Sequence, residues 1–172
     1  MDLARETVDV ARALSDAAAL FEMEAEEVGL ALAVETPDTP RWGRADPDGL
    51  QVVLKNLLSN AVKFTGNGGR IEARVRAGDD AVTIEIEDSG IGMHPENVPG
   101  LFEAFKQASE GVGREYEGTG LGLTVAKEVL DQMDGAIDVD TERDEGTCCT
   151  VRLPRAEEAP TPKESRLQEN RL

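Results

Sequence analysis

Three polar side chains recur at helical spacing within an amphipathic stretch over residues 47–64. Asn56, Asn60 and Lys63 fall at steps of four and three residues, so they form one line on the flank of the apolar face. Two amides and an ammonium in such a line could coordinate a hydrated cation and contact phosphate oxygens. Taken alone, the three residues are more typical of the ordinary polar flank of a surface helix.

Asp88 ends a stretch in which apolar and polar residues alternate, and it shares the phase of the apolar positions. The pleat of a strand would therefore deliver its carboxylate to the covered face of a sheet, where it needs hydrogen-bond donors. Gly90 and Gly92 follow in a turn that lets a flat group approach the backbone closely. The exocyclic amine of a purine would satisfy Asp88, and a neighbouring backbone N–H group would satisfy it equally well.

A second glycine cluster opens a later helical pattern and consists of Gly118, Thr119, Gly120, Leu121, Gly122 and Leu123. Bare N–H groups at the start of a helix, with glycines that admit a close ligand, can bind a phosphate. The spacing matches neither the dinucleotide-binding fingerprint nor the Walker loop. Lys106 and Arg114, just upstream, could contact phosphates, or they could be ordinary solvated cations of a loop.

Helices and a loop are expected around these residues. Helical periodicity covers residues 3–28, 47–64 and 121–133. Asp46 is expected to cap the second of these helices, with Pro47 at its first position. Residues 88–120 are rich in glycine and lack periodicity, which indicates either a functional lid or disorder.

Extended patterns predict strands at residues 30–34, 41–43, 70–77, 81–87, 137–139 and 147–153. The two strands over 70–77 and 81–87 form a hairpin with one buried face, and the short piece at 41–43 is expected to pair with 30–34. The segment from 155 to 172 has no core pattern and is expected to be a disordered tail.

The composition restricts the class of protein. A chain of 172 residues allows one domain with appendages. Its net charge of -17 argues against nucleic acid as a partner, and its aromatic content of 3% requires an aliphatic core. Two adjacent cysteines and one histidine exclude a disulfide framework and a metal cluster of thiolates and imidazoles. No apolar run approaches the ~20 residues of a membrane span, so we expect no membrane contact and a cytoplasmic location.

Five motifs, taken in order, resemble the N, G1, F, G2 and G3 boxes of the sensor histidine kinase catalytic domain. They occupy residues 56–65, 88–93, 101–105, 118–123 and 146–147. The resemblance covers about residues 30–154 and implies the Bergerat ATP-binding fold of the GHKL superfamily. That fold is an α/β (α+β) two-layer sandwich, in which helices cover one face of a mixed sheet and a flexible lid closes over the nucleotide.

The resemblance also implies roles for single residues in binding ATP and Mg²⁺. Asn60 would ligate Mg²⁺, Asp88 would receive the adenine amine, and Thr147 would lie beside the base. Asn56, Lys63 and Arg114 would serve phosphoryl transfer next to the triphosphate. The other positions would shape the base pocket, anchor the lid or contact phosphates, and they are Gly90, Gly92, Phe102, Phe105, Lys106, Gly118, Thr119, Gly120, Leu121, Gly122 and Leu123.

Two residues depart from the pattern of the family. Cys149 stands where the family usually places Phe, so the back of the base pocket is expected to be looser. Glu117 precedes the glycines of the G2 box, where a small residue is common. Both departures concern packing around the lid and the base rather than the expected contacts to phosphate.

The expected activity follows from the amide side chain at position 56 and from the presence of a single histidine. Hydrolysing relatives have a glutamate there that activates water, and an amide cannot act as a general base near neutral pH. The only histidine, His94, precedes Pro95 in a loop, so we expect it to be an ordinary solvated residue. The sequence therefore predicts a catalytic domain, over 29–154, that transfers the γ-phosphoryl group of ATP to a histidine on a separate dimerisation domain, upstream of a response regulator.

Two other functions stay open at this stage: a stand-alone GHKL-type ATPase, and a non-catalytic interaction module that binds nucleotide. Residues 1–28 are expected to be the remnant of a dimerisation or adaptor helix. Its apolar stripe would be exposed, which invites self-association.

Overall fold

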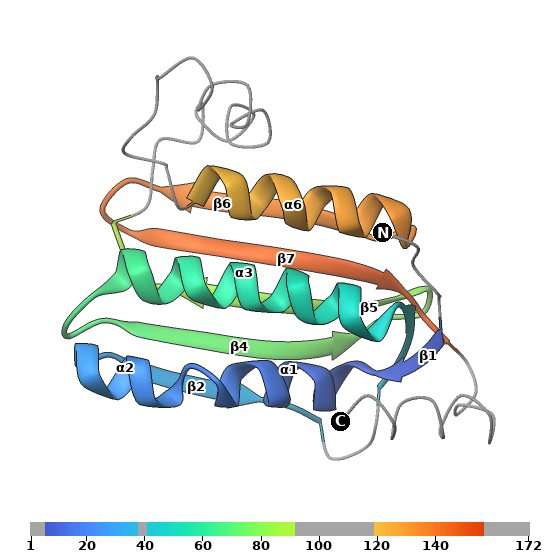
Figure 1. The fold of residues 1–172 in the computed structure, drawn as a ribbon, viewed down its shortest axis with the longest axis horizontal. Coiled ribbons are helices and arrows are strands. Elements are labelled where there is room, and N and C mark those ends of the chain that lie inside the picture. The colour runs from blue at the N-terminus through green and yellow to red at the C-terminus, as the bar shows by residue number, and fades with distance from the viewer. Residues whose placement is uncertain (1–5, 38–40, 92–118, 157–172) are drawn as a thin grey trace.

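The computed structural model describes residues 6–37, 41–91 and 119–156 of the chain. Its main sheet has five strands in the order β2-β4-β5-β7-β6 (Figure 1). β2 is parallel to β4, and every other pair of neighbours in this sheet is antiparallel, so the sheet is mixed. The strands are β2 (Ala31–Glu35), β4 (Arg70–Ala77), β5 (Ala81–Asp88), β6 (Ala136–Glu142) and β7 (Gly146–Pro154).

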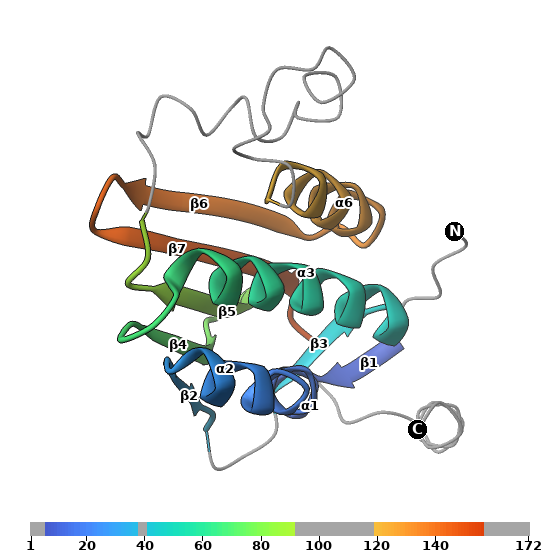
Figure 2. The same cartoon turned by 60° about the vertical axis from the view of Figure 1, so that its left-hand side comes forward.

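Helices form a second layer on one face of this sheet. Figures 1 and 2 show α3 in the middle of the layer, with α6 on one side and α1 and α2 on the other. The helices are α1 (Val10–Ala19), α2 (Glu22–Val28), α3 (Pro47–Thr65) and α6 (Thr119–Gln132). The core between the layers is aliphatic and includes the fully buried Leu14, Leu54, Leu58, Ile84 and Leu130. The expected two-layer sandwich is confirmed.

Local sequence explains why α3 begins where it does. The Asp46 carboxylate accepts a hydrogen bond from the backbone N–H of Gly49 at 2.8 Å, and Pro47 occupies the first turn, where no N–H partner is needed. Leu50, Leu54 and the other apolar residues of the helix are buried against the sheet. The helix predicted from 47 to 64 is confirmed, as is the hairpin of β4 and β5.

The N-terminal segment differs from the sequence prediction. A single helix over 3–28 is wrong, because Glu6–Asp9 form a strand, β1, and the helical part is split between α1 and α2 at Leu20 and Phe21. β-branched Thr7 and Val8 favour the extended chain, and the Asp9 carboxylate then accepts from the Arg12 N–H to cap α1.

The apolar stripe of α1 is buried, not exposed. Ala11, Leu14, Ala17 and Ala18 are at most 7% exposed and pack in the same core as α3. The expectation of an exposed stripe on residues 1–28 is therefore wrong, and with it the physical basis for self-association through that stripe.

A second correction concerns the strand near Trp42. β3 (Trp42–Ala45) pairs antiparallel with β1, in a separate two-stranded sheet, and not with β2 as expected. Gly43 permits this pairing, since a Cβ there would lie 2.9 Å from a methyl group of Val10. The other edge of β3 contacts the chain after β7, where the N–H of Ala156 donates to the Trp42 carbonyl at 2.9 Å. Arg155 and Ala156 are thus held by backbone hydrogen bonds, and the rest of the expected tail lies outside the described residues.

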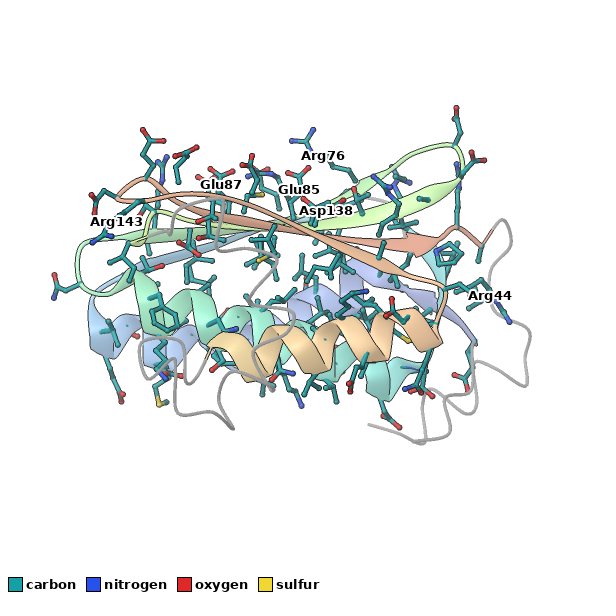
Figure 3. The ribbon with its side chains drawn as sticks, turned by 90° about the horizontal axis from the view of Figure 1, so that it is seen from above. Arg44, Arg76, Glu85, Glu87, Asp138 and Arg143 are labelled. Carbon is teal, nitrogen blue, oxygen red and sulfur yellow. The ribbon has the colours of Figure 1, made fainter. Side chains whose placement is uncertain are left out.

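The second face of the main sheet is not covered by the helices and carries charged side chains. Figure 3 shows Glu85, Glu87, Arg76 and Asp138 on the side away from the helices. At its centre, the Arg74 guanidinium donates to Glu85 at 2.8 Å, to Glu87 at 2.6 Å and to Glu72 at 3.1 Å. Hydrogen bonds and charge from Glu85 and Glu87 raise the pKa of Arg74 above its ordinary value, against the opposing effect of burial.

Replacing Arg74 with Met is expected to lower the free energy of unfolding by about 2 kcal/mol, because three carboxylates would face one another without their shared cation. The matched control is Arg76→Met on the same strand, where the side chain is 65% exposed against 16% for Arg74 and the expected loss is below about 0.5 kcal/mol. Urea unfolding measures both variants. Equal losses of unfolding free energy in the two variants would show that the contacts of Arg74 with three carboxylates do not stabilise the fold.

Candidate functional site

The line of polar residues lies on the C-terminal half of α3. Asn56 and Asn60 are half-buried, and the Lys63 side chain is exposed with its ammonium 5.6 Å from the centre of the Phe64 ring. The side-chain nitrogen of Asn60 is buried, and within the described parts of the chain it has no hydrogen-bond partner. A buried amide nitrogen without a partner is unfavourable in a purely structural role, so it favours the ligand-binding interpretation of this line.

Asp88 lies at the end of β5 in a row of residues that crosses the sheet. It is paired with Ile71 on β4 and with Thr147 on β7, which is in turn paired with Thr141 on β6. The N–H groups of Gly90 and Thr147 donate to the Asp88 carboxylate, the first of them at 2.9 Å. Burial raises the pKa of Asp88 above its ordinary value, and these two hydrogen bonds only partly offset the rise. Two carboxylate oxygens can accept about four hydrogen bonds, so capacity for a further donor remains.

The turn after β5 is bound to the end of α3. The N–H of Ile91 donates to the Phe64 carbonyl at 3.3 Å, and a Cβ on Gly90 would overlap that same oxygen. A glycine at 90 is therefore required for the close approach of the two segments. This contact brings the Asp88 end of the sheet to the end of α3 that carries Asn60 and Lys63.

The chain also approaches Asp88 closely at the start of β7. Gly146 has a φ of 116°, and a Cβ there would overlap the carbonyl oxygen of Asp88. Thr147, the next residue, is half-buried beside Asp88. The structure therefore brings together Asp88, Gly90 and Thr147, three residues that sequence reasoning assigned to the base pocket.

The second glycine cluster coincides with the start of α6, whose backbone is helical from Thr119 onward. This position confirms that a helix begins at the cluster, with Gly120, Leu121, Gly122 and Leu123 in its first turns. The other expected site residues lie outside the described residues and are Gly92, Phe102, Phe105, Lys106, Arg114 and Gly118. His94 and Glu117 lie outside them as well.

The two adjacent cysteines occupy opposite faces of the sheet. Cys149 shares the inner face with Ile86 and Val139, its neighbours on β5 and β6, and it is half-buried. Burial, and the nearby charge of Asp88, raise the pKa of Cys149 to about 12. Its thiol therefore stays protonated next to the carboxylate that is expected to bind the base.

Sequence reasoning missed one residue of this region, Thr141. Its side chain is 2% exposed, and its hydroxyl oxygen lies 2.8 Å from that of Thr147. Its signal is its phase: Ile137 and Val139 point inward on β6, so the next inward position, at 141, should be apolar and instead carries a hydroxyl.

A family model named "Histidine kinase-, DNA gyrase B-, and HSP90-like ATPase" matches residues 45–157, which is more than half of the chain. The chain belongs to this ATPase family. Its match begins just before α3 and ends just after β7, so it includes the line on α3, the Asp88 row and the start of α6.

Relatives of this ATPase domain are sensor kinases of greater length. Sensor histidine kinase RcsC of Escherichia coli K12 is 44% identical over 128 residues, which cover 74% of this chain and 13% of RcsC. Sensor protein GacS of Pseudomonas syringae pv. syringae is 41% identical over 128 residues, covering 70% of this chain and 14% of GacS. The chain thus spans about an eighth of the length of these curated relatives.

Solved structures agree on the fold. The nucleotide-free catalytic domain of histidine kinase ThkA matches with a TM-score of 0.77 at 22% identity, over 94% of this chain and 99% of that domain. Full-length ShkA in complex with AMPPNP matches with a TM-score of 0.78 at 30% identity, over 94% of this chain and 33% of ShkA. The catalytic-domain fold of histidine kinases is therefore confirmed for this ATPase domain. None of its helices, within the described residues, is long and apolar enough to cross a bilayer.

Proposed function

We propose that this domain binds Mg·ATP and presents the γ-phosphoryl group to a histidine of a separate dimerisation domain in a cytoplasmic two-component pathway. The strongest support is that a group suited to a base amine and a group of residues suited to phosphate and Mg²⁺ lie at the same end of the molecule. A half-buried carboxylate with spare acceptor capacity, Asp88, lies next to the end of α3 that carries Asn60 and Lys63. A purine amine at Asp88 would leave the phosphates of the same nucleotide free to extend along α3.

The residue at position 56 supports transfer rather than hydrolysis. Asn56 is half-buried on α3, and an amide cannot take a proton from water near neutral pH. The naming of RcsC and GacS as sensor proteins supports the same choice over a stand-alone ATPase. We assign Asn56, Lys63 and Arg114 to positioning and charge neutralisation at the triphosphate, which is most of what phosphoryl transfer requires from a protein.

The residues present fit a magnesium ion held through Asn60. An amide oxygen is a ligand that Mg²⁺ accepts together with phosphate oxygens and water. The buried nitrogen of the same side chain has no hydrogen-bond partner within the described residues, which supports a ligand at this amide. When bound, the ion would neutralise charge on the phosphates. The chain's own task there is to hold the amide in place, which the packing of α3 does.

Substituting Asn60 with Ala is expected to remove the magnesium dependence of ADP affinity, because the side chain that would ligate the ion is lost. Calorimetric titration with ADP, with and without Mg²⁺, measures the difference. Ser59→Ala is the matched control, since Ser59 is the exposed neighbour on the same helix. An Asn60→Ala domain whose affinity still rises with Mg²⁺ would contradict the assignment.

Phosphoryl transfer itself is tested by mixing the domain with a separately prepared, histidine-bearing dimerisation domain and ATP labelled at the γ-phosphate. Acid-labile label on the histidine is the expected result. Nucleotide binding without label on the histidine would favour the interaction module, and steady release of phosphate by the domain alone would favour the ATPase. A response regulator added afterwards is expected to take the label from the histidine.

A further inference from the structure

The row of residues across the sheet contains two threonines in contact, Thr147 of the expected base pocket and Thr141 behind it. Thr147 lies between Asp88 on one side and Thr141 on the other. We propose that Thr141 fixes the direction of the Thr147 hydroxyl proton and thereby makes the site selective for a purine with an amine at C6. This inference rests on the proposed nucleotide site and concerns its choice of base.

The hydrogen bonds around Thr141 and Thr147 support one placement of their two hydroxyl protons. The Thr141 hydroxyl lies 3.2 Å from the carbonyl oxygen of Gly146, which can only accept, and we assign the single proton of Thr141 to this hydrogen bond. The two hydroxyl oxygens are 2.8 Å apart, and this contact also needs one proton. Either hydroxyl could donate in this contact, and with the Thr141 proton assigned to Gly146 the proton between the two oxygens comes from Thr147. Thr147 then presents only lone pairs to whatever lies beside it.

The position of Thr147 beside Asp88 determines which base edge the site can accept. Asp88 is the directly paired residue, and side chains of such pairs have Cβ atoms about 4.5–5.5 Å apart. An ionised carboxylate and a hydroxyl whose proton is engaged are both acceptors. A base edge that faces this pair must bring donors, as the 6-amino group of adenine does. A 6-oxo purine would bring a carbonyl oxygen against two acceptors instead.

Thr141 would act on the base through Thr147, not by touching it. Its side chain is 2% exposed, whereas Thr147 is half-buried at the edge of the row. Thr141 is therefore a positioning residue that is shielded from the ligand. Without its hydroxyl, the Thr147 proton would be free to turn toward the base, and Thr147 could then donate to a 6-oxo group.

The test is the ratio of the dissociation constants of IDP and ADP, measured by calorimetry on the whole chain with Mg²⁺. We expect the wild-type domain to prefer ADP, and Thr141→Val to narrow the ratio about tenfold, mainly through tighter IDP binding. Thr141→Ser, which keeps the hydroxyl, is expected to retain the wild-type ratio. In a Thr147→Val background, Thr141→Val is expected to leave the ratio unchanged, because the hydroxyl through which it acts is absent.

Thermal unfolding without nucleotide controls for the fold of each variant. Should Thr141→Val not fold, Thr141→Ala removes the same hydroxyl without an added methyl group, and its ratio decides in the same way. A wild-type ratio in the folded hydroxyl-free variant would overturn this inference while leaving ATP binding intact. A wild-type domain that binds no ADP would overturn the proposed function, and this inference with it.

Discussion

Asp88→Asn is expected to weaken ADP binding by about 100-fold, which corresponds to about 2.7 kcal/mol. The N–H groups of Gly90 and Thr147 already donate to the side chain at this position. In the variant these donors would hold the amide oxygen, which leaves the amide nitrogen to face the amine of the base. Donor would then meet donor, so the site would lose a charged hydrogen bond and gain a repulsive contact.

Calorimetry with Mg·ADP measures this loss. Asp138→Asn is the control, because Asp138 lies on the face of the sheet away from the helices and its substitution removes the same charge (Figure 3). We expect the control to bind like the wild type. If Asp88→Asn also binds ADP normally while remaining folded, the base pocket has been placed on the wrong residue.

Gly146→Ala is expected to destabilise the fold by about 3 kcal/mol or more. The added Cβ would overlap the Asp88 carbonyl oxygen, and the φ of 116° is one that residues with a side chain rarely adopt. The overlapped atom belongs to the backbone of a central strand, so it cannot move aside without disturbing the pairing of β5 with β7.

Urea unfolding measures the loss of stability in Gly146→Ala, and Gly68→Ala is the control variant. Gly68 also has a positive φ, of 83°, but a Cβ there would meet no atom within 4 Å. Only the backbone conformation is penalised in this control, at a cost of about 1–2 kcal/mol. Should the two variants lose the same stability, the close approach at Asp88 would be shown to be readily relieved.

The central elements could be predicted because their local signals agree with their packing. The alternating residues of β4 and β5 have one buried face. In α3, the Asp46 cap predicts where the helix begins, and the apolar stripe predicts which of its faces is buried. The phase of Asp88 placed it correctly on the face covered by helices. Each of these features depends on a periodicity within one segment.

The features that escaped prediction depend on contacts between distant segments. The apolar spacing at Val8, Ala11 and Leu14 is the same for one long helix as for a strand followed by a helix, and the pairing of β1 with β3 decides between them. Thr141 gains its role from a hydroxyl on the neighbouring strand, which its own sequence context does not show.

The alternation of side chains along β7 separates the chemistry of its two thiols. Cys148 and Cys149 are adjacent in sequence, yet they face opposite sides of the sheet, so oxidation cannot join them within the regular strand. The thiol of Cys149 is kept protonated by a pKa of about 12, and thiols react with oxidants chiefly as thiolates. Burial also raises the pKa of Cys148, on the face away from the helices, so neither thiol of this strand is activated toward oxidants near neutral pH.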